Sequence, residues 1–200
     1  MRAATASVQS DEPGLIFETA SFDTDVTVVG PVAATLCIKS TTADADLFLV
    51  LDAIDPTGNR VELRDHRGGI TAMTVGWQRA SQRAVDESRS KAWQPYHPHR
   101  RAEPLVPGEP YDVAVELRPT SLDLPAGSRL RLTVRGHGPA HDDKVDRPEA
   151  LFANRVTVLT GPNATSHLLI PIIIGDRSES YRSAEKRSVS AACAASCFGR

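Results

Sequence analysis

The sequence predicts an all-β protein, a two-sheet β-sandwich of the jelly-roll type. Short segments in which apolar and polar residues alternate recur along the 200-residue chain, and turns rich in Gly and Pro separate them. Hardly any segment has the 3.6-residue hydrophobic period of an amphipathic helix. Many short strands with little helix are typical of sandwiches and jelly rolls. The length suffices for one domain with a sizeable core.

The stretch Gly30–Gly58 predicts two strands and a closing turn. Residues 32–39 alternate between apolar residues and small or polar ones, as in a half-buried strand. Residues 47–51 are apolar on both faces, which places them in the middle of a sheet that is covered on both sides. Asp55–Gly58 has Pro at its second position and Gly at its fourth, the signature of a type I β-turn.

Further strands follow the same pattern on both sides of this stretch. We predict them within 15–30 and at 61–63, 70–75, 111–117, 130–134, 156–159 and 167–174, the last two as a closing pair. In residues 129–135 an apolar stripe has an arginine-rich stripe on the opposite face. We expect the sandwich to occupy residues 14–175, with a flexible segment at 1–13 and a disordered tail, rich in Ser and Ala, at 176–200.

Residues 76–104 interrupt the strand pattern. The segment is rich in Arg, Ser and Pro, and we expect a long excursion over the surface with a short helical turn near Ala80–Arg89. Its basic and aromatic side chains form a mixture that can bind nucleic acid. Acidic residues interrupt the run, however, and the net charge of the chain is −2. A solvated or docking surface is therefore favoured, and no nucleic-acid partner is expected.

The chain lacks the common motifs of catalysis and cofactor binding. It has no G-x-S-x-G nucleophile elbow, no phosphate-binding glycine loop and no dinucleotide fingerprint. Histidines in two polar loops, at 97–99 and 137–141, lack the neighbouring ligands of a specific metal site. Asp44 and Asp46 could hold Ca²⁺ through their carboxylates, but bracing their loop is the favoured role. We therefore predict no catalytic residue, no cofactor and no metal.

Four motifs, in order along residues 13–174, resemble those of one family. Gly30–Gly58 has a Gly-Pro opening, a strand, D-A-D, an apolar strand and Asp-Pro-x-Gly. Gly76–Arg83 is similar to G-x-x-R-A-S-x-R, Pro104–Glu109 to P-L-x-P-G-E, and Leu124–Leu132 to a segment that leads into R-L-R-L. The series resembles the C-terminal, non-catalytic domain of X-Pro dipeptidyl-peptidases and bacterial cocaine esterases, the CocE/NonD family of serine hydrolases.

The resemblance implies a galactose-binding-domain-like jelly roll that accompanies an α/β-hydrolase catalytic domain. In the family the Ser-Asp-His triad lies in that preceding domain, so no catalytic residue carries over to this chain. The implied role is to pack against the catalytic domain and to shape its substrate pocket, and the chain alone is expected to be inactive. Five residues are expected to serve as structural motif or in domain docking: Asp44, Asp46, Trp77, Arg79 and Arg83.

Two other interpretations stay open. The chain could be a free-standing jelly-roll module that binds carbohydrate or another ligand through aromatic platforms. It could also be a remnant that folds poorly without its partner and exposes an apolar patch. The sequence has no apolar run of about 18 residues for a bilayer and no signal-like N-terminus. A cytoplasmic location without a membrane partner is therefore expected.

Overall fold

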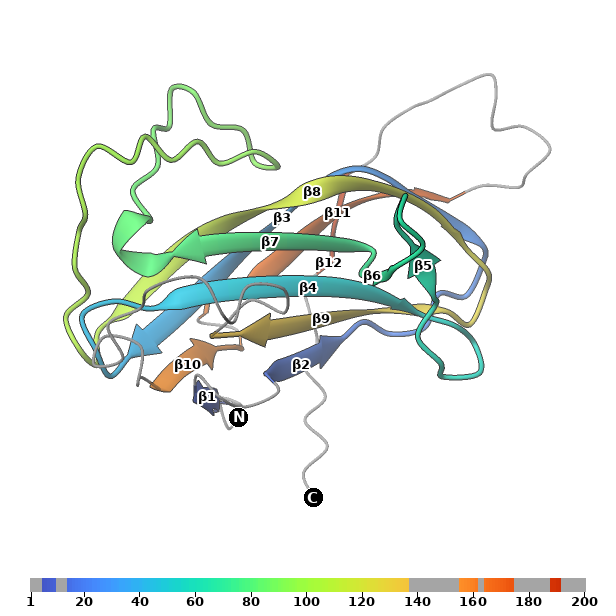
Figure 1. The fold of residues 1–200 in the computed structure, drawn as a ribbon, viewed down its shortest axis with the longest axis horizontal. Coiled ribbons are helices and arrows are strands. Elements are labelled where there is room, and N and C mark those ends of the chain that lie inside the picture. Colours follow the sequence, from blue (N-terminus) through green and yellow to red (C-terminus); the bar gives the residue numbers. More distant parts are fainter. Residues whose placement is uncertain (1–4, 10–13, 137–154, 162–163, 175–187, 192–200) are drawn as a thin grey trace.

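The computed structural model describes residues 5–9, 14–136, 155–161, 164–174 and 188–191 (Figure 1). The regular elements in these ranges are strands, apart from the three-residue 3₁₀ helix η1 (Ala80–Gln82). In chain order the strands are β1 (Thr5–Gln9), β2 (Leu15–Glu18), β3 (Val26–Ser40), β4 (Asp46–Ile54), β5 (Leu63–Arg64), β6 (Ile70–Thr71), β7 (Thr74–Arg79), β8 (Pro110–Leu124), β9 (Arg129–Arg135), β10 (Arg155–Leu159), β11 (His167–Ile174) and β12 (Ser188–Ala191).

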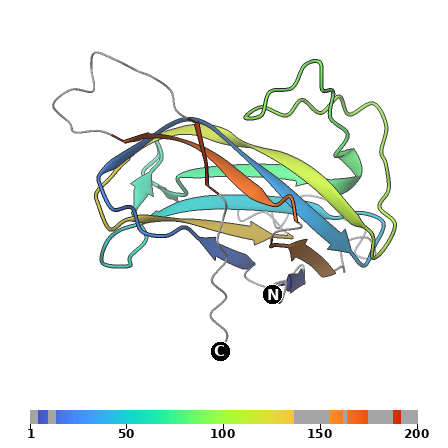
Figure 2. The same ribbon diagram turned by 180° about the vertical axis from the view of Figure 1, so that it is seen from behind.

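The long strands β3 and β8 pair along nearly their whole length and form the centre of one layer. Their antiparallel register runs from Val26 opposite Leu124 to Lys39 opposite Pro110, with one irregularity after Gly30. On its other edge β3 pairs with two strands, β11 along its first part and β10 at its end. Figure 2 shows this layer from behind.

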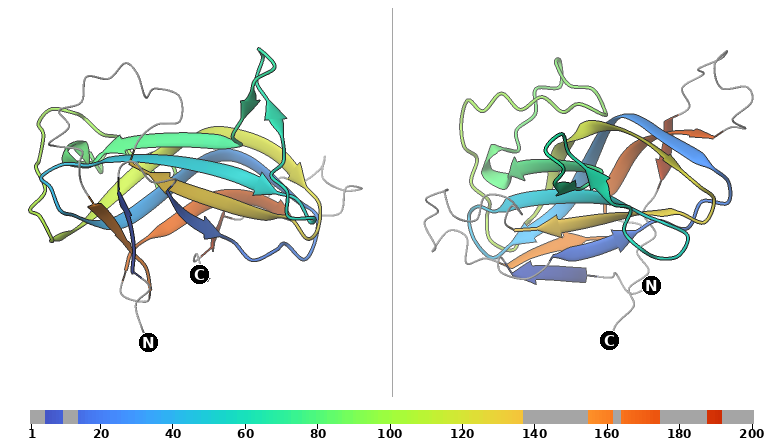
Figure 3. Two further views of the ribbon diagram at one scale, coloured as in Figure 1. Left: turned by 60° about the horizontal axis from the view of Figure 1, so that its bottom comes forward. Right: turned by 45° about the vertical axis from the view of Figure 1, so that its right-hand side comes forward.

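The second layer contains β7, β4, β9 and β2, each hydrogen-bonded to the next. The two layers join where Gly76 of β7 lies opposite Leu117 of β8. A Cβ atom at position 76 would lie 2.4 Å from the carbonyl oxygen of Glu116, so the close approach requires glycine. The strands thus form one curled antiparallel sheet whose halves face each other, while β5 and β6 form a separate hairpin (Figure 3).

The core lies between the two halves of the sheet. It consists of inward-facing aliphatic side chains that alternate along the strands with exposed or half-exposed residues. The largest side chains with less than 2% exposure come from both layers: Val28, Val32, Ile38, Leu47, Leu49, Leu51, Ile54, Val113, Val115, Leu117, Leu124 and Leu130. The predicted all-β sandwich is therefore confirmed.

Strand β7 differs from its prediction. It continues to Arg79, whereas residues 76–104 were expected to lie outside the strands, so that boundary was wrong. Alternation is hidden here because Gly76 has no side chain and the polar Gln78 occupies a buried position. The amide of Gln78 is satisfied there, because Nε2 donates hydrogen bonds to the carbonyl oxygens of Arg79 and Gln82.

The helical turn and the closing strands also differ from expectation. The turn begins at Ala80 but ends at Gln82, well before the predicted Arg89. β10 and β11 do not pair with each other as predicted, because each pairs with β3. The 15 residues of β3 are long enough to hold the two strands one after the other along the same edge.

Two short strands lie in the segments that were predicted to flank the sandwich. β1 pairs with β10, and β12 pairs with β11. The domain boundaries at residues 14 and 175 stay a prediction. Most of the predicted polar loop 136–149 and of the tail 176–200 lies outside the described residues. In the part of the chain that is described, no helix is long and apolar enough to cross a membrane.

Candidate functional site

Asp46 and Arg79 form an ion pair between adjacent strands. They lie directly opposite each other in the β4–β7 register. Nε of Arg79 donates to Oδ1 of Asp46 at 2.9 Å, and Nη2 donates to Oδ2 at 3.1 Å. The hydrogen bond with Asp46 raises the pKa of Arg79 above its ordinary value. Two parallel charge-assisted bonds hold the first residue of β4 to the last residue of β7.

Asp44 braces the loop between β3 and β4 against η1. Its Oδ1 accepts hydrogen bonds from the backbone N–H groups of Ala45 and Ser81, at 2.9 and 2.8 Å. Its Oδ2 accepts the Ser81 hydroxyl at 2.7 Å. The Arg79 guanidinium lies 4.0 Å from the same carboxylate. These bonds are those of a loop brace, the role that the turn preference of Asp favoured.

Arg83 holds the start of the following long loop. Its Nη1 donates to the carbonyl oxygens of Ala80 and Glu103, and its Nη2 lies 3.8 Å from the Glu103 carboxylate. The guanidinium carbon also lies 4.4 Å from the centre of the Tyr111 ring. Arg83 thus connects η1, the returning loop and β8. Its interactions are directed toward its own chain.

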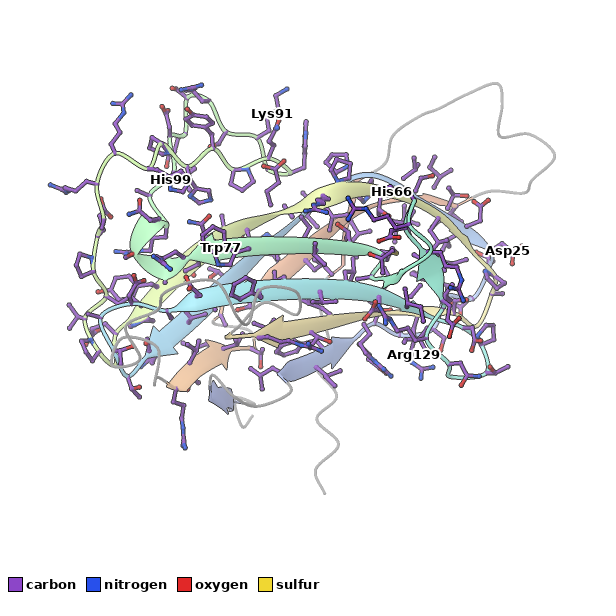
Figure 4. All side chains as sticks on the ribbon, viewed as in Figure 1. Asp25, His66, Trp77, Lys91, His99 and Arg129 are labelled. Atoms are coloured by element: carbon purple, nitrogen blue, oxygen red, sulfur yellow. The ribbon has the colours of Figure 1, made fainter. Side chains whose placement is uncertain are left out.

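Trp77 differs from the four charged residues because it faces outward. Its side chain is 51% exposed on β7, and Figure 4 shows it on the open face of the sheet. It stacks on Phe48 of β4 with ring centroids 6.0 Å apart. The structure therefore brings Asp44, Asp46 and Arg79 together as a braced corner and leaves Trp77 beside it at the surface.

The long loop after η1 is organised by contacts of its own. The guanidinium carbon of Arg89 lies 3.6 Å from the centre of the Tyr96 ring, and Nζ of Lys91 lies 5.7 Å from that of Trp93. Backbone hydrogen bonds pair Lys91 and Gln94 in both directions. The basic and aromatic residues that suggested a binding surface thus contact each other, which favours the docking or solvated surface of the sequence analysis.

His97, which lies in the polar loop predicted at 97–99, anchors the long loop. Nδ1 lies 3.1 Å from the carbonyl oxygen of Ala84, and Nε2 lies 3.1 Å from that of Ala114 in β8. His99 lies next to it, with ring centroids 6.0 Å apart. Among the described residues, no group of three His, Cys, Asp or Glu side chains could hold a metal ion. The composition of the loop gave no signal for this anchor, because the acceptor at Ala114 is a backbone carbonyl 17 residues away in the sequence.

Comparison with known proteins places this architecture in a family. The family of X-Pro dipeptidyl-peptidase C-terminal non-catalytic domains matches residues 1–169. A protein of Mycobacterium bovis, provisionally named a serine esterase, is 31% identical over 131 residues, which are 64% of this chain and 19% of that protein. A protein of Streptomyces avermitilis, provisionally named a Xaa-Pro dipeptidyl-peptidase, is 29% identical over 178 residues, 80% of this chain and 25% of that protein.

A solved structure also matches this chain over part of a longer hydrolase. The CocE/NonD family hydrolase of Staphylococcus aureus matches with a TM-score of 0.75 and 27% identity, over 86% of this chain and 33% of that chain. This chain spans about a fifth to a quarter of the curated relatives and a third of the solved hydrolase. The chain belongs to the family of X-Pro dipeptidyl-peptidase C-terminal non-catalytic domains.

Proposed function

We propose that this chain is the accessory β-sandwich domain of a serine hydrolase that cleaves acyl or peptide bonds. It packs on an α/β-hydrolase catalytic domain, stabilises it and forms part of the wall of its substrate pocket. The observation that carries the proposal is the match to the Staphylococcus aureus hydrolase, which covers 86% of this chain but 33% of that protein. The remaining two thirds of such a chain would supply the catalytic domain.

The polar cluster at the braced corner supports an architectural role. Asp44 and Asp46 accept hydrogen bonds from their own chain, and the Arg79 guanidinium is bound to Asp46. Both nitrogens of His97 face backbone carbonyls. Groups bonded to their own chain in this way hold loops in position. A general base would instead have to lie within hydrogen-bonding distance of the substrate proton that it abstracts.

The purified chain tests the assignment of catalysis to another domain. We expect no hydrolysis of p-nitrophenyl acetate or of Ala-Pro-p-nitroanilide above the buffer blank. His97→Ala and Ser81→Ala variants serve as controls for contaminating hydrolases, since contamination would give the same rate in all preparations. Turnover by the wild-type chain that one Ser or His substitution abolishes would overturn the proposal.

Carbohydrate binding is the second candidate function, because Trp77 is half exposed next to Phe48 and could act as a platform for a sugar ring. A glycan array with the labelled chain tests it. Binding that is lost in Trp77→Ala and retained in Trp93→Ala would favour this function over domain docking. An array without a binder would rule out the glycans that it displays.

A cytoplasmic location is the remaining part of the proposal. Cys37 is a free, half-buried thiol, which is compatible with a reducing compartment. Fractionation of the source cells, with detection of the chain by antibody, tests the location. Recovery of the chain from the medium or the envelope would contradict it.

A further inference from the structure

Three side chains form a row across the outer face of the second layer. In the strand register Phe48 of β4 lies opposite Trp77 of β7 on one side and opposite Arg135 of β9 on the other. Their neighbours Leu47 and Leu49 on β4 are buried in the core, so the row faces the opposite way. We call Trp77, Phe48 and Arg135 the outer row.

Arg135 has a buried hydrogen-bond donor that is not satisfied. Its Nε is buried from solvent and has no hydrogen-bond partner. An unpaired buried donor is destabilising and uncommon, and a charged one more so. The other two arginines of β9 are satisfied, because Nε of Arg129 and Nε of Arg131 each donate to a carboxylate oxygen of Glu18, at 2.9 and 2.6 Å. The Nε of Arg135 thus lacks an acceptor that its neighbours have.

The surroundings of the outer row have the organisation of a binding interface. An ion pair, Asp46 with Arg79, borders it on one side, two residues along β4 and β7. The row itself offers a half-exposed Trp, a stacked Phe and an Arg. Trp and Arg are enriched among the residues that dominate binding energy, and such residues lie inside a rim of polar groups.

We infer that the outer row is the surface on which the α/β-hydrolase domain docks, an inference that rests on the proposed function. The partner covers Trp77 with apolar side chains and brings a carboxylate or a carbonyl oxygen to the partly exposed side chain of Arg135. The occupant follows from two observations. The solved hydrolase carries about two thirds of its chain outside the matched domain. The row itself combines a tryptophan that is 51% exposed with an arginine whose Nε has no hydrogen-bond partner.

A chimaera tests the inference. The third of the Staphylococcus aureus hydrolase that matches this chain is replaced by this chain, and the exposure of each tryptophan is measured by hydroxyl-radical footprinting and mass spectrometry. We expect labelling of Trp77 to fall several-fold in the chimaera relative to the isolated chain. Trp93, 44% exposed on the long loop, is the matched internal control and should keep its labelling.

The chimaera also separates the two possible failures. Its thermal unfolding is compared with that of the same hydrolase truncated before the matched third. A chimaera no more stable than the truncated enzyme, with a separate unfolding transition for this chain, would overturn the proposed function. A chimaera stabilised as one cooperative unit, in which Trp77 is labelled as strongly as in the isolated chain, would overturn the docking inference alone.

Variants give a second measurement of the same contact. Trp77→Ala and Arg135→Gln should lower the unfolding midpoint of the chimaera by more than they lower that of the isolated chain. Trp93→Ala should change both midpoints equally. Equal shifts for Trp77→Ala in the two proteins would show that the side chain contributes only to its own domain and would contradict the inference.

Discussion

The two residues of the Asp46–Arg79 ion pair differ in their exposure to solvent. The Asp46 side chain is 2% exposed, whereas the Arg79 side chain is 34% exposed. The carboxylate therefore depends on the guanidinium, while the guanidinium has access to water. Because a buried charge left without its partner is far more costly than an exposed one, the two partners are not equivalent for stability.

Replacing Arg79 should cost more stability than replacing Asp46. Arg79→Ala strands a buried carboxylate, and we expect a loss of about 3 kcal/mol in the free energy of unfolding. Asp46→Ala leaves an arginine that can turn to water, and we expect a loss of about 1–2 kcal/mol. Urea unfolding measures both. Arg60→Ala, which breaks the more exposed pair with Asp52, is the control and should cost less than about 1 kcal/mol. Equal losses at Asp46 and Arg79 would contradict the asymmetry.

Gly76→Ala should destabilise the junction between the layers. The added Cβ would lie 2.4 Å from the Glu116 carbonyl oxygen and 2.9 Å from a side-chain carbon of Leu117. Since backbone must shift to relieve the clash, we expect a loss of about 2–4 kcal/mol by thermal or urea unfolding. Gly69→Ala is the matched control, because its nearest neighbour is the flexible Asp65 side chain at 3.3 Å. An unchanged midpoint for Gly76→Ala would show that the layers are not closely joined there.

Glu18 should make the stability depend on acid pH. Burial acts to raise the pKa of Glu18, but the hydrogen bonds and charges of Arg131 and Arg129 outweigh it and hold the pKa below the ordinary value of 4.5. The contribution of Glu18 is therefore complete above about pH 4.5 and is lost as the pH falls through the lowered pKa. Glu18→Gln should be less stable than the wild type at pH 7, and the difference should shrink at acid pH.

Unfolding midpoints of the wild type and Glu18→Gln are measured from pH 7 to pH 3. The difference between them should decline below about pH 4.5. Glu62→Gln is the control, because Glu62 and Arg64 are both largely exposed and 3.7 Å apart. A difference between Glu18→Gln and the wild type that stays constant with pH would show that the ionised carboxylate is not what stabilises β2 on β9.

His97→Ala should loosen the long loop without unfolding the sandwich. The substitution removes the contacts of both ring nitrogens with the backbone of Ala84 and Ala114. Local opening exposes backbone to proteases, so trypsin should cleave several-fold faster at Arg89 or Lys91. Mass spectrometry locates the cleavage sites. His66→Ala, an exposed histidine between β5 and β6, should leave the rate unchanged, and a similar acceleration there would refute the anchor.

The local pattern of the sequence was sufficient for the fold class and most strands. Alternation predicted the core faces of β3, β8 and β9, and continuous apolarity predicted the buried strand β4. The local pattern failed where a strand contains residues that break the alternation of apolar and polar side chains. Gly76 lacks a side chain and Gln78 is buried with its amide satisfied, so the end of β7 resembled a loop.

The sequence by itself determined most of the segments that become strands and which family the chain resembles, because side-chain periodicity and short motifs are local properties. The tertiary structure alone decided which partners the residues take. Asp46 meets Arg79, 33 residues away, and His97 meets the backbone of Ala114. It also decided that Trp77 faces outward while Gln78 faces inward. Pairing and exposure of this kind depend on how distant strands come together, and no local pattern records that arrangement.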